Sequence, residues 1–273
     1  LLCCVNSDGC SYNSDTPCDN YSQCYWPPDA QSEVWGPKPD AMIAGVLIPS
    51  CGKAVKVKGG WNLVGRWPFA SGIYGCDWFI ATAFIENSSG VKTAQMHIIP
   101  RTDYDILDTW HTAGLRGTGS SDVVVDNCFV PFHRALPINA TKGGGDAPGC
   151  EVNKEPLFKL PAFSMFSINQ STVALGLAQS TFDNYIDIAR ARVARVSGKN
   201  VSDYSTAQVK VGEAHTAINM AKMLLHNCCE LGMAVAEKNQ MASMELKTEL
   251  RAKAAMAGKL SVEAVHLLFQ LSG

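Results

Sequence analysis

The spacing of hydrophobic residues changes part-way along the chain, and this change limits the folds that the chain can adopt. Between Met42 and Pro131 the sequence consists of short apolar runs separated by turn residues, which is typical of β-strands. From about Ser164 the apolar residues recur every three or four positions, the spacing of one face of a helix. The sequence therefore predicts a β-rich part followed by a helical part, an α+β architecture.

The run from Trp61 to Phe69 illustrates the strand pattern. In a regular strand its large residues point to one face because they are an even number of positions apart, and we expect that face to be buried. These residues are Trp61, Leu63, Trp67 and Phe69. Lys58-Gly59-Gly60 directly precedes the run and predicts a tight turn.

Three helices are predicted in the second half of the chain. Their apolar stripes are Leu175, Ala178, Phe182, Tyr185, Ala189 and Val193, then Val211, Ala214, Ile218, Ala221, Leu225, Cys228 and Val235, and finally Ala257, Leu260, Ala264, Leu267 and Leu271. The second stripe follows Ser205-Thr206-Ala207-Gln208, the pattern of a capping box. Three amphipathic helices suggest a four-helix bundle without its last member.

Two further segments complete a division of the chain into 1–27, 28–136, 137–160 and 161–273. Residues 137–160 contain Gly143-Gly144-Gly145 and Ala147-Pro148-Gly149, so we expect a linker that runs over the surface without packing. Residues 1–27 form a leader in which five of the eleven cysteines fall within the first 24 positions. A disulfide-rich secreted module or a divergent leader of little structure would explain this cluster, and no Cys-x-x-Cys pair in it supports a zinc site.

Charge and hydropathy exclude several classes of partner. The chain has 23 Lys and Arg against 25 Asp and Glu, so a net charge of −2 gives no broad attraction to nucleic acid or to an anionic membrane surface. The apolar runs of the sequence are all shorter than the roughly 18 residues that a membrane-spanning helix needs. The sequence therefore predicts a cytoplasmic protein without a nucleic-acid or membrane partner.

A series of motifs in the β-rich part resembles one protein family. The motifs are Gly60-Trp61, Gly65–Gly72 (GRWPFASG), Trp78, Asp108–Val125 (DTWHTAGLRGTGSSDVVV) and Phe129-Val130-Pro131. They resemble the middle domain of the acyl-CoA dehydrogenase superfamily. The long motif Asp108–Val125 is most similar to the flavin-dependent monooxygenase branch of this superfamily, which includes the oxygenase component of 4-hydroxyphenylacetate 3-hydroxylase. The similarity runs from about Pro28 to Gly273.

This resemblance implies a specific domain organisation. It makes residues 28–136 a β-barrel or sandwich that binds flavin and substrate, and residues 161–273 a truncated C-terminal helical bundle. The family's N-terminal helical domain and last helix are not visible in the sequence. By the same resemblance we expect a homotetramer.

The resemblance also implies a flavin site at the end of the GRWPFASG motif. Phe69 would meet the flavin ring, the Ser71 hydroxyl would bond flavin N5, and the Gly72 backbone would be free to approach the ligand. Thr118 and Ser120 would lie near the active-site cavity. Without the family, Phe69 is equally well a core aromatic residue and Ser71 a turn-capping hydroxyl.

Three charged or titratable residues are further candidates. Arg116 lies in a glycine-rich, donor-rich loop suited to an anion or a polar ligand edge. His111 is a candidate catalytic base, because the ordinary pKa of a histidine lies near neutrality. The alternative is that His111 only packs beside Trp110. By resemblance Arg192 would hold the flavin phosphates, with Arg190 and Arg195 as alternatives and a solvated basic helix end as the plain explanation.

The sequence thus predicts an oxygenase that takes reduced FAD or FMN from a separate reductase and hydroxylates a phenolic or other aromatic substrate with O2. The catalytic candidates are Ser71 and His111, and no metal is expected. An acyl-CoA dehydrogenase is the first alternative. Its proton-abstracting glutamate would lie beyond Gly273, so the lack of this glutamate here does not exclude it. A non-catalytic scaffold or an inactive fragment is the second.

Overall fold

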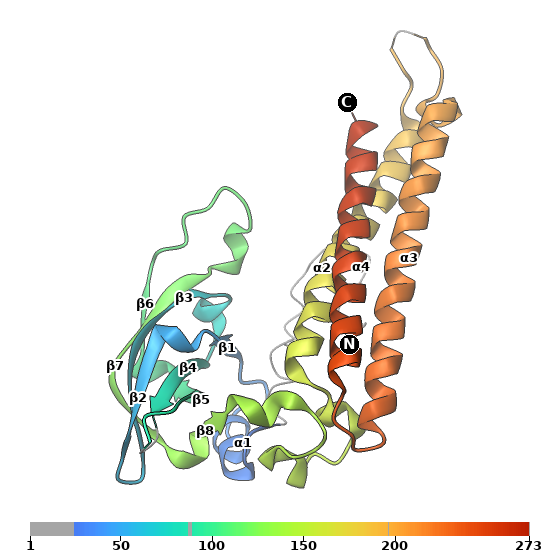
Figure 1. The fold of residues 1–273 in the computed structure, drawn as a ribbon. Helices are drawn as coiled ribbons and strands as arrows, with labels where there is room; N and C mark the ends of the chain where they lie inside the picture. The colour runs from blue at the N-terminus through green and yellow to red at the C-terminus, as the bar shows by residue number, and fades with distance from the viewer. Residues whose placement is uncertain (1–24, 87–88, 196, 273) are drawn as a thin grey trace. The chain divides into compact units, whose positions relative to one another are not determined.

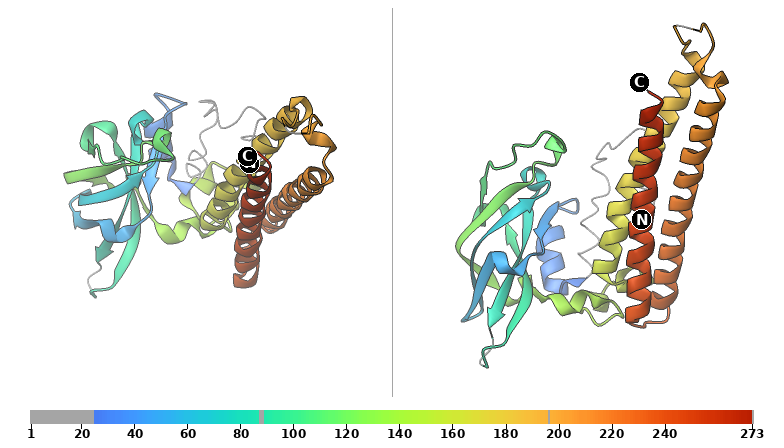
Figure 2. Two further views of the ribbon diagram at one scale, coloured as in Figure 1. Left: turned by 90° about the horizontal axis from the view of Figure 1, so that it is seen from above. Right: turned by 45° about the horizontal axis from the view of Figure 1, so that its top comes forward.

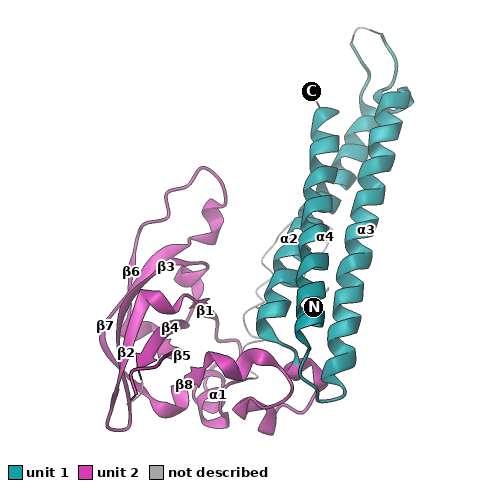
Figure 3. Ribbon diagram, viewed as in Figure 1, with its two compact units in different colours: residues 1–13, 160–273 teal, residues 14–159 magenta. Residues whose placement is uncertain are grey.

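The computed structural model describes residues 25–86, 89–195 and 197–272. These residues form two compact units, one extending to Lys159 and the other beginning at Leu160 (Figure 3). The leader predicted over residues 1–27 lies outside the described residues up to position 24. Among the helices described, none has both the length and the apolar character that a membrane crossing requires.

The first unit is built on a mixed sheet of eight strands (Figure 1). The strands are β1 (Ile43–Val46), β2 (Gly52–Val57), β3 (Gly60–Ala70), β4 (Trp78–Glu86), β5 (Lys92–Pro100), β6 (Asp105–Leu107), β7 (Ser121–Pro131) and β8 (Ala135–Pro137). Seven follow the order β6-β7-β3-β2-β4-β5-β8, and β1 pairs in parallel with β4. Figure 2 shows the strands from two further directions. The predicted β-rich region is confirmed, since its strands begin at Ile43 and β7 ends at Pro131.

The hairpin of β2 and β3 forms around the predicted turn and carries the largest side chain of the sheet core. Val57 pairs with Gly60, and Gly59 takes a left-handed φ of 85° between them, a conformation that glycine adopts without strain. Trp67 on β3 is fully buried, and its indole Nε1 donates to Thr82 O on β4 over 2.7 Å. This hydrogen bond removes the penalty of burying the indole N–H.

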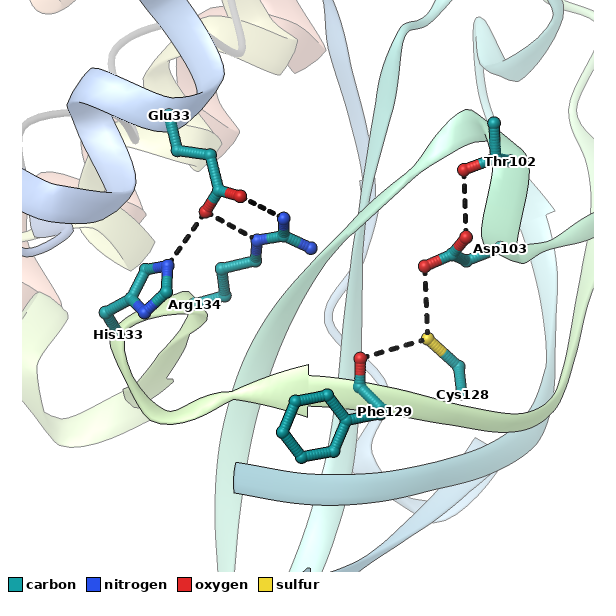
Figure 4. A network of polar contacts seen from close by, with 7 residues as sticks. All are labelled: Glu33, Thr102, Asp103, Cys128, Phe129, His133 and Arg134. Atoms are coloured by element: carbon teal, nitrogen blue, oxygen red, sulfur yellow. Dashed lines mark hydrogen bonds and ion pairs between the residues drawn. The ribbon is translucent and has the colours of Figure 1, made fainter. Parts of the chain in front are cut away.

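Helix α1 (Pro28–Trp35) is joined to the segment after β7 by a charged cluster (Figure 4). Glu33 accepts hydrogen bonds from both sides of the Arg134 guanidinium and lies 2.8 Å from His133 Nε2. The hydrogen bonds from Arg134 lower the pKa of Glu33 to about 2 and outweigh burial, which acts in the opposite direction. The ion pair therefore persists over the whole physiological pH range.

The ends of the first unit differ from the sequence-based expectation. Tyr25 and Trp26 fall within the predicted leader, yet both are almost fully buried. The glycine-rich segment 137–160 was expected not to pack, but it forms short 3₁₀ helices and buries Thr141, Ala147 and Cys150. The glycine-rich composition therefore does not prevent this segment from packing.

The second unit consists of three long helices packed on one another. They are α2 (Ala162–Ala191), α3 (Ser205–Ala236) and α4 (Met244–Gln270). The predicted stripes form their contacts, because Ala178, Ala221, Leu225, Ala257 and Ala264 are fully buried. Two details of the prediction are wrong. Val193 lies beyond the end of α2 and is exposed, and no side chain caps α3, since Ser205 is its first helical residue and Gln208 donates to Ser202 O instead.

Candidate functional site

A β-bulge ends β3 and decides which way its last side chains point. Trp67 pairs with Val123 of β7, but the next pair is Ala70 with Ser121, so β3 has one residue more than its partner over this stretch. Phe69 lies in the bulge with a left-handed φ of 61°, and 64% of its surface is exposed. The expectation that Phe69 shares the buried face of Trp67 is therefore wrong, and Ala70 is buried in its place.

The exposed Phe69 ring meets the indole of Trp110. Their centroids are 6.2 Å apart, and the rings are nearly perpendicular at 85°. Trp110 belongs to the loop of residues 108–120 between β6 and β7, and its Nε1 donates to Leu115 O over 3.0 Å. This edge-to-face pair gives the site a partly exposed apolar surface that suits a flat aromatic ligand.

A row of three hydroxyl groups lies beside the bulge. Ser71 Oγ is 2.8 Å from Ser120 Oγ, which is 2.8 Å from Thr118 Oγ1. Gly72 N donates to Thr118 O over 2.7 Å, and this bond ties the end of β3 to the 108–120 loop. Ser71 is exposed, whereas Ser120 is buried. The structure therefore brings together five predicted site residues, namely Phe69, Ser71, Gly72, Thr118 and Ser120.

The other end of the 108–120 loop is held by a carboxylate that sequence reasoning did not single out. Asp122 accepts from Arg66 Nε over 2.7 Å and from Thr109 Oγ1 over 2.9 Å, and its own N–H donates to Thr109 Oγ1 over 3.0 Å. The Asp122 side chain is 13% exposed. These bonds fix the start of the loop to β7, so Trp110 is anchored next to a rigid point. An acidic residue directly after the Ser-Ser pair was the available signal.

Two predicted residues of the loop remain exposed. Arg116 lies in the 3₁₀ turn Arg116–Thr118 and its guanidinium is open to solvent. His111 is also exposed, and its Nε2 lies 3.2 Å from the backbone O of Asp108 in the same loop. Both side chains are available to a ligand, and neither is held in one orientation by packing.

Arg192 belongs to the helical unit and lines a pocket of about 340 Å³ there. It is the residue directly after α2, and its Nη1 donates to Ser272 O over 3.2 Å. Other walls of the pocket come from Tyr185, Leu268 and Phe269. Arg190, Arg192 and Arg195 are all exposed, and of the three only Arg192 belongs to the lining of this pocket.

Comparison with known proteins gives a consistent assignment. Residues 168–273 match the family "Acyl-CoA dehydrogenase, C-terminal domain". The flavin-dependent monooxygenase oxygenase subunit HsaA of Mycobacterium tuberculosis is 33% identical over 251 residues, which cover 89% of this chain and 62% of that protein. The crystal structure of 3-HSA hydroxylase from Rhodococcus sp. RHA1 superposes with a TM-score of 0.86 at 30% identity, covering 93% of this chain and 66% of that one. This chain belongs to the flavin-dependent monooxygenase branch of the acyl-CoA dehydrogenase superfamily.

A further member of this branch is named for a phenolic substrate. The oxygenase component of an FADH2-dependent resorcinol hydroxylase from a Rhizobium species is 32% identical over 205 residues. They cover 73% of this chain and 50% of that protein. The chain thus spans between half and two thirds of the length of these monooxygenases, and the predicted similarity to the branch is confirmed.

Proposed function

We propose that this chain is part of the oxygenase component of a two-component aromatic hydroxylase. It would use O2 and reduced FAD or FMN, delivered by a separate reductase, to hydroxylate a phenolic or related aromatic substrate. One observation carries the proposal: the exposed Phe69 ring, which contacts the half-buried Trp110, lies next to the Ser71 hydroxyl in a chain whose relatives are named as flavin-dependent monooxygenases and hydroxylases.

The residues at the end of β3 fit a flavin. The Phe69 ring offers a flat apolar surface, and Ser71 offers an exposed hydroxyl two residues further on. Gly72 has a φ of 74°, and a Cβ added there would meet nothing within 4 Å, so the backbone leaves room for a ring system. A bound reduced flavin would supply the two electrons with which O2 is cleaved, so that one oxygen atom would enter an electron-rich ring and the other would leave as water.

The chain's own residues have distinct roles in this proposal. Phe69 and Trp110 exclude water from one side of the reacting atoms, and Ser71 holds a hydrogen bond to the flavin. Arg116 supplies an exposed positive charge at the loop, and His111 is the proposed proton carrier of the same loop. Arg192 is proposed to bind phosphate, because a guanidinium forms paired hydrogen bonds with phosphate oxygens and stays charged.

The helices support the proposal of a homotetramer. Several large apolar side chains on their outer surfaces are more than half exposed, which is typical of a subunit interface. They include Leu177, Ile188, Met223 and Phe269. Light scattering of the full-length protein at micromolar concentration checks this, and a monodisperse monomer would contradict it.

A cytoplasmic location also remains our proposal. The cysteines of the described residues are thiols rather than disulfides, as expected in a reducing compartment. They are Cys51, Cys76, Cys128, Cys150, Cys228 and Cys229.

Isotope labelling tests the activity directly. The full-length protein is mixed with chemically reduced FAD or FMN, a panel of phenols and ¹⁸O2, and the products are analysed by mass spectrometry. We expect one ¹⁸O atom in the hydroxylated product and a loss of product with release of H2O2 in a Ser71→Ala variant. Reduction of the flavin by an acyl-CoA, with no labelled phenol, would establish dehydrogenase activity instead.

A further inference from the structure

We infer that Thr118 and Ser120 are positioning residues that make Ser71 a hydrogen-bond acceptor, so that the site prefers reduced over oxidised flavin. The inference rests on the proposed flavin site and assigns a specificity role to two residues that do not themselves need to touch the flavin. It follows from the direction in which the protons of the hydroxyl row must point.

The direction is set at the inner end of the row. Thr118 Oγ1 lies 2.9 Å from Leu115 O, and a carbonyl oxygen can only accept. Two oxygens this close repel each other without a proton between them, so the Thr118 hydroxyl donates to Leu115 O. The same carbonyl also accepts from Trp110 Nε1 and Thr118 N, so it is fixed from three sides.

The remaining protons follow from the first. Because the single proton of Thr118 is used, the 2.8 Å contact between Thr118 and Ser120 requires the proton of Ser120. The 2.8 Å contact between Ser120 and Ser71 then requires the proton of Ser71. Ser120 is 4% exposed, so water does not readily replace either partner. Ser71 is left with lone pairs for a ligand and no proton to give.

The two redox forms of a flavin differ at the atom that would face Ser71. N5 of a reduced flavin carries a hydrogen and donates, whereas N5 of an oxidised flavin has a lone pair and accepts. An accepting Ser71 therefore matches the reduced form. To bind the oxidised form, Ser71 must turn its single proton away from Ser120 and toward N5. The Ser120 oxygen then faces a neighbouring hydroxyl oxygen with no proton between them, or the hydrogen-bonded row breaks. An oxygenase that receives its flavin from solution needs this preference.

A neighbouring pair of hydroxyls provides a matched control. Tyr74 Oη and Ser121 Oγ are 2.9 Å apart, a bond of the same kind in the same part of the unit. Among the described residues, neither hydroxyl is hydrogen-bonded to the row formed by Ser71, Ser120 and Thr118. A Tyr74→Phe variant thus removes one hydroxyl–hydroxyl bond without changing the direction of the row.

The test compares dissociation constants for the two redox forms. Kd is measured for oxidised FAD and FMN and, without oxygen, for dithionite-reduced FAD and FMN in the full-length protein. Thr118→Val and Ser120→Ala free the Ser71 proton, so we expect the ratio of oxidised to reduced Kd to fall about tenfold, the scale of one hydrogen bond. Thr118→Ser keeps the hydroxyl and should keep the wild-type ratio, as should Tyr74→Phe.

Binding and stability measurements separate the possible failures. Thermal melting identifies a variant that does not fold, and the Thr118→Ser rescue shows whether the hydroxyl itself sets the ratio. A wild-type protein that prefers reduced flavin, with the same ratio in Thr118→Val and Ser120→Ala, overturns this inference and leaves the proposed function standing. A wild-type protein that binds neither redox form overturns both.

Discussion

His97 makes the stability of the first unit depend on pH in a defined way. It lies on β5 with no exposed surface, and its Nδ1 is 3.3 Å from Ala81 O. Among the described residues its Nε2 has no hydrogen-bond partner. Burial lowers the pKa of His97 from 6.5 to about 4, because a charged imidazolium in this position loses its hydration. The native unit therefore contains a neutral imidazole.

The size of the effect follows from the two pKa values. Below pH 6.5 the unfolded chain binds a proton at His97, whereas the folded chain binds this proton only when the pH falls to about 4. Stability is thus fully present above pH 6.5 and is lost as the pH falls through this window. At about 1.4 kcal/mol for each pH unit, the loss reaches about 3 kcal/mol. The carboxylate of Glu33 titrates mainly below this range, with a folded pKa of about 2.

Tryptophan fluorescence isolates this unit, because all six tryptophans lie between Trp26 and Trp110. Urea unfolding at several pH values between 7 and 4 gives the free energy of unfolding for wild type and a His97→Asn variant. We expect the wild type to lose about 3 kcal/mol more than the variant over this range. His226→Asn, which removes an exposed histidine, is the control and should keep the wild-type slope. Parallel profiles for wild type and His97→Asn would refute the argument.

Two further predictions concern packing and ligand binding. A Cβ at Gly52 would lie 2.1 Å from the Trp67 ring, so Gly52→Ala should lower the free energy of unfolding by about 3 kcal/mol, whereas Gly75→Ala, with nothing within 4 Å of the added Cβ, should not. Urea titration followed by fluorescence distinguishes them, and equal stabilities would contradict the packing. Arg192→Ala should weaken flavin binding about tenfold and Arg190→Ala should not, because Arg192 lines the pocket. If both variants bound flavin with equal affinity, Arg192 would not be part of the flavin site.

The elements that depend on local sequence could be predicted. The helical stripes were recognisable because a residue's burial on a helix follows from its spacing alone, as Ala221, Leu225 and Cys228 on α3 show. The β2–β3 turn was recognisable because Gly59 must adopt a positive φ. The capping box was predicted wrongly because the same residues are compatible with a helix that begins one position earlier, at Ser205 itself. Buried packing of 137–160 was missed because glycine content alone does not distinguish a linker from a close-packed segment.

The family resemblance grouped the residues of the site, but the direction in which they point could not be predicted from the strand pattern, because it depends on the pairing of two distant strands. Without the bulge, the register of Trp67 with Val123 would place Phe69 opposite Ser121 and turn its ring to the buried face. With the extra residue, Ala70 takes that place, and the continued register brings Ser71 next to Ser120, 49 positions away. One insertion therefore exposes the aromatic ring and assembles the hydroxyl row together. Pro68 was the available signal, since a residue without an N–H favours an irregular strand at that point.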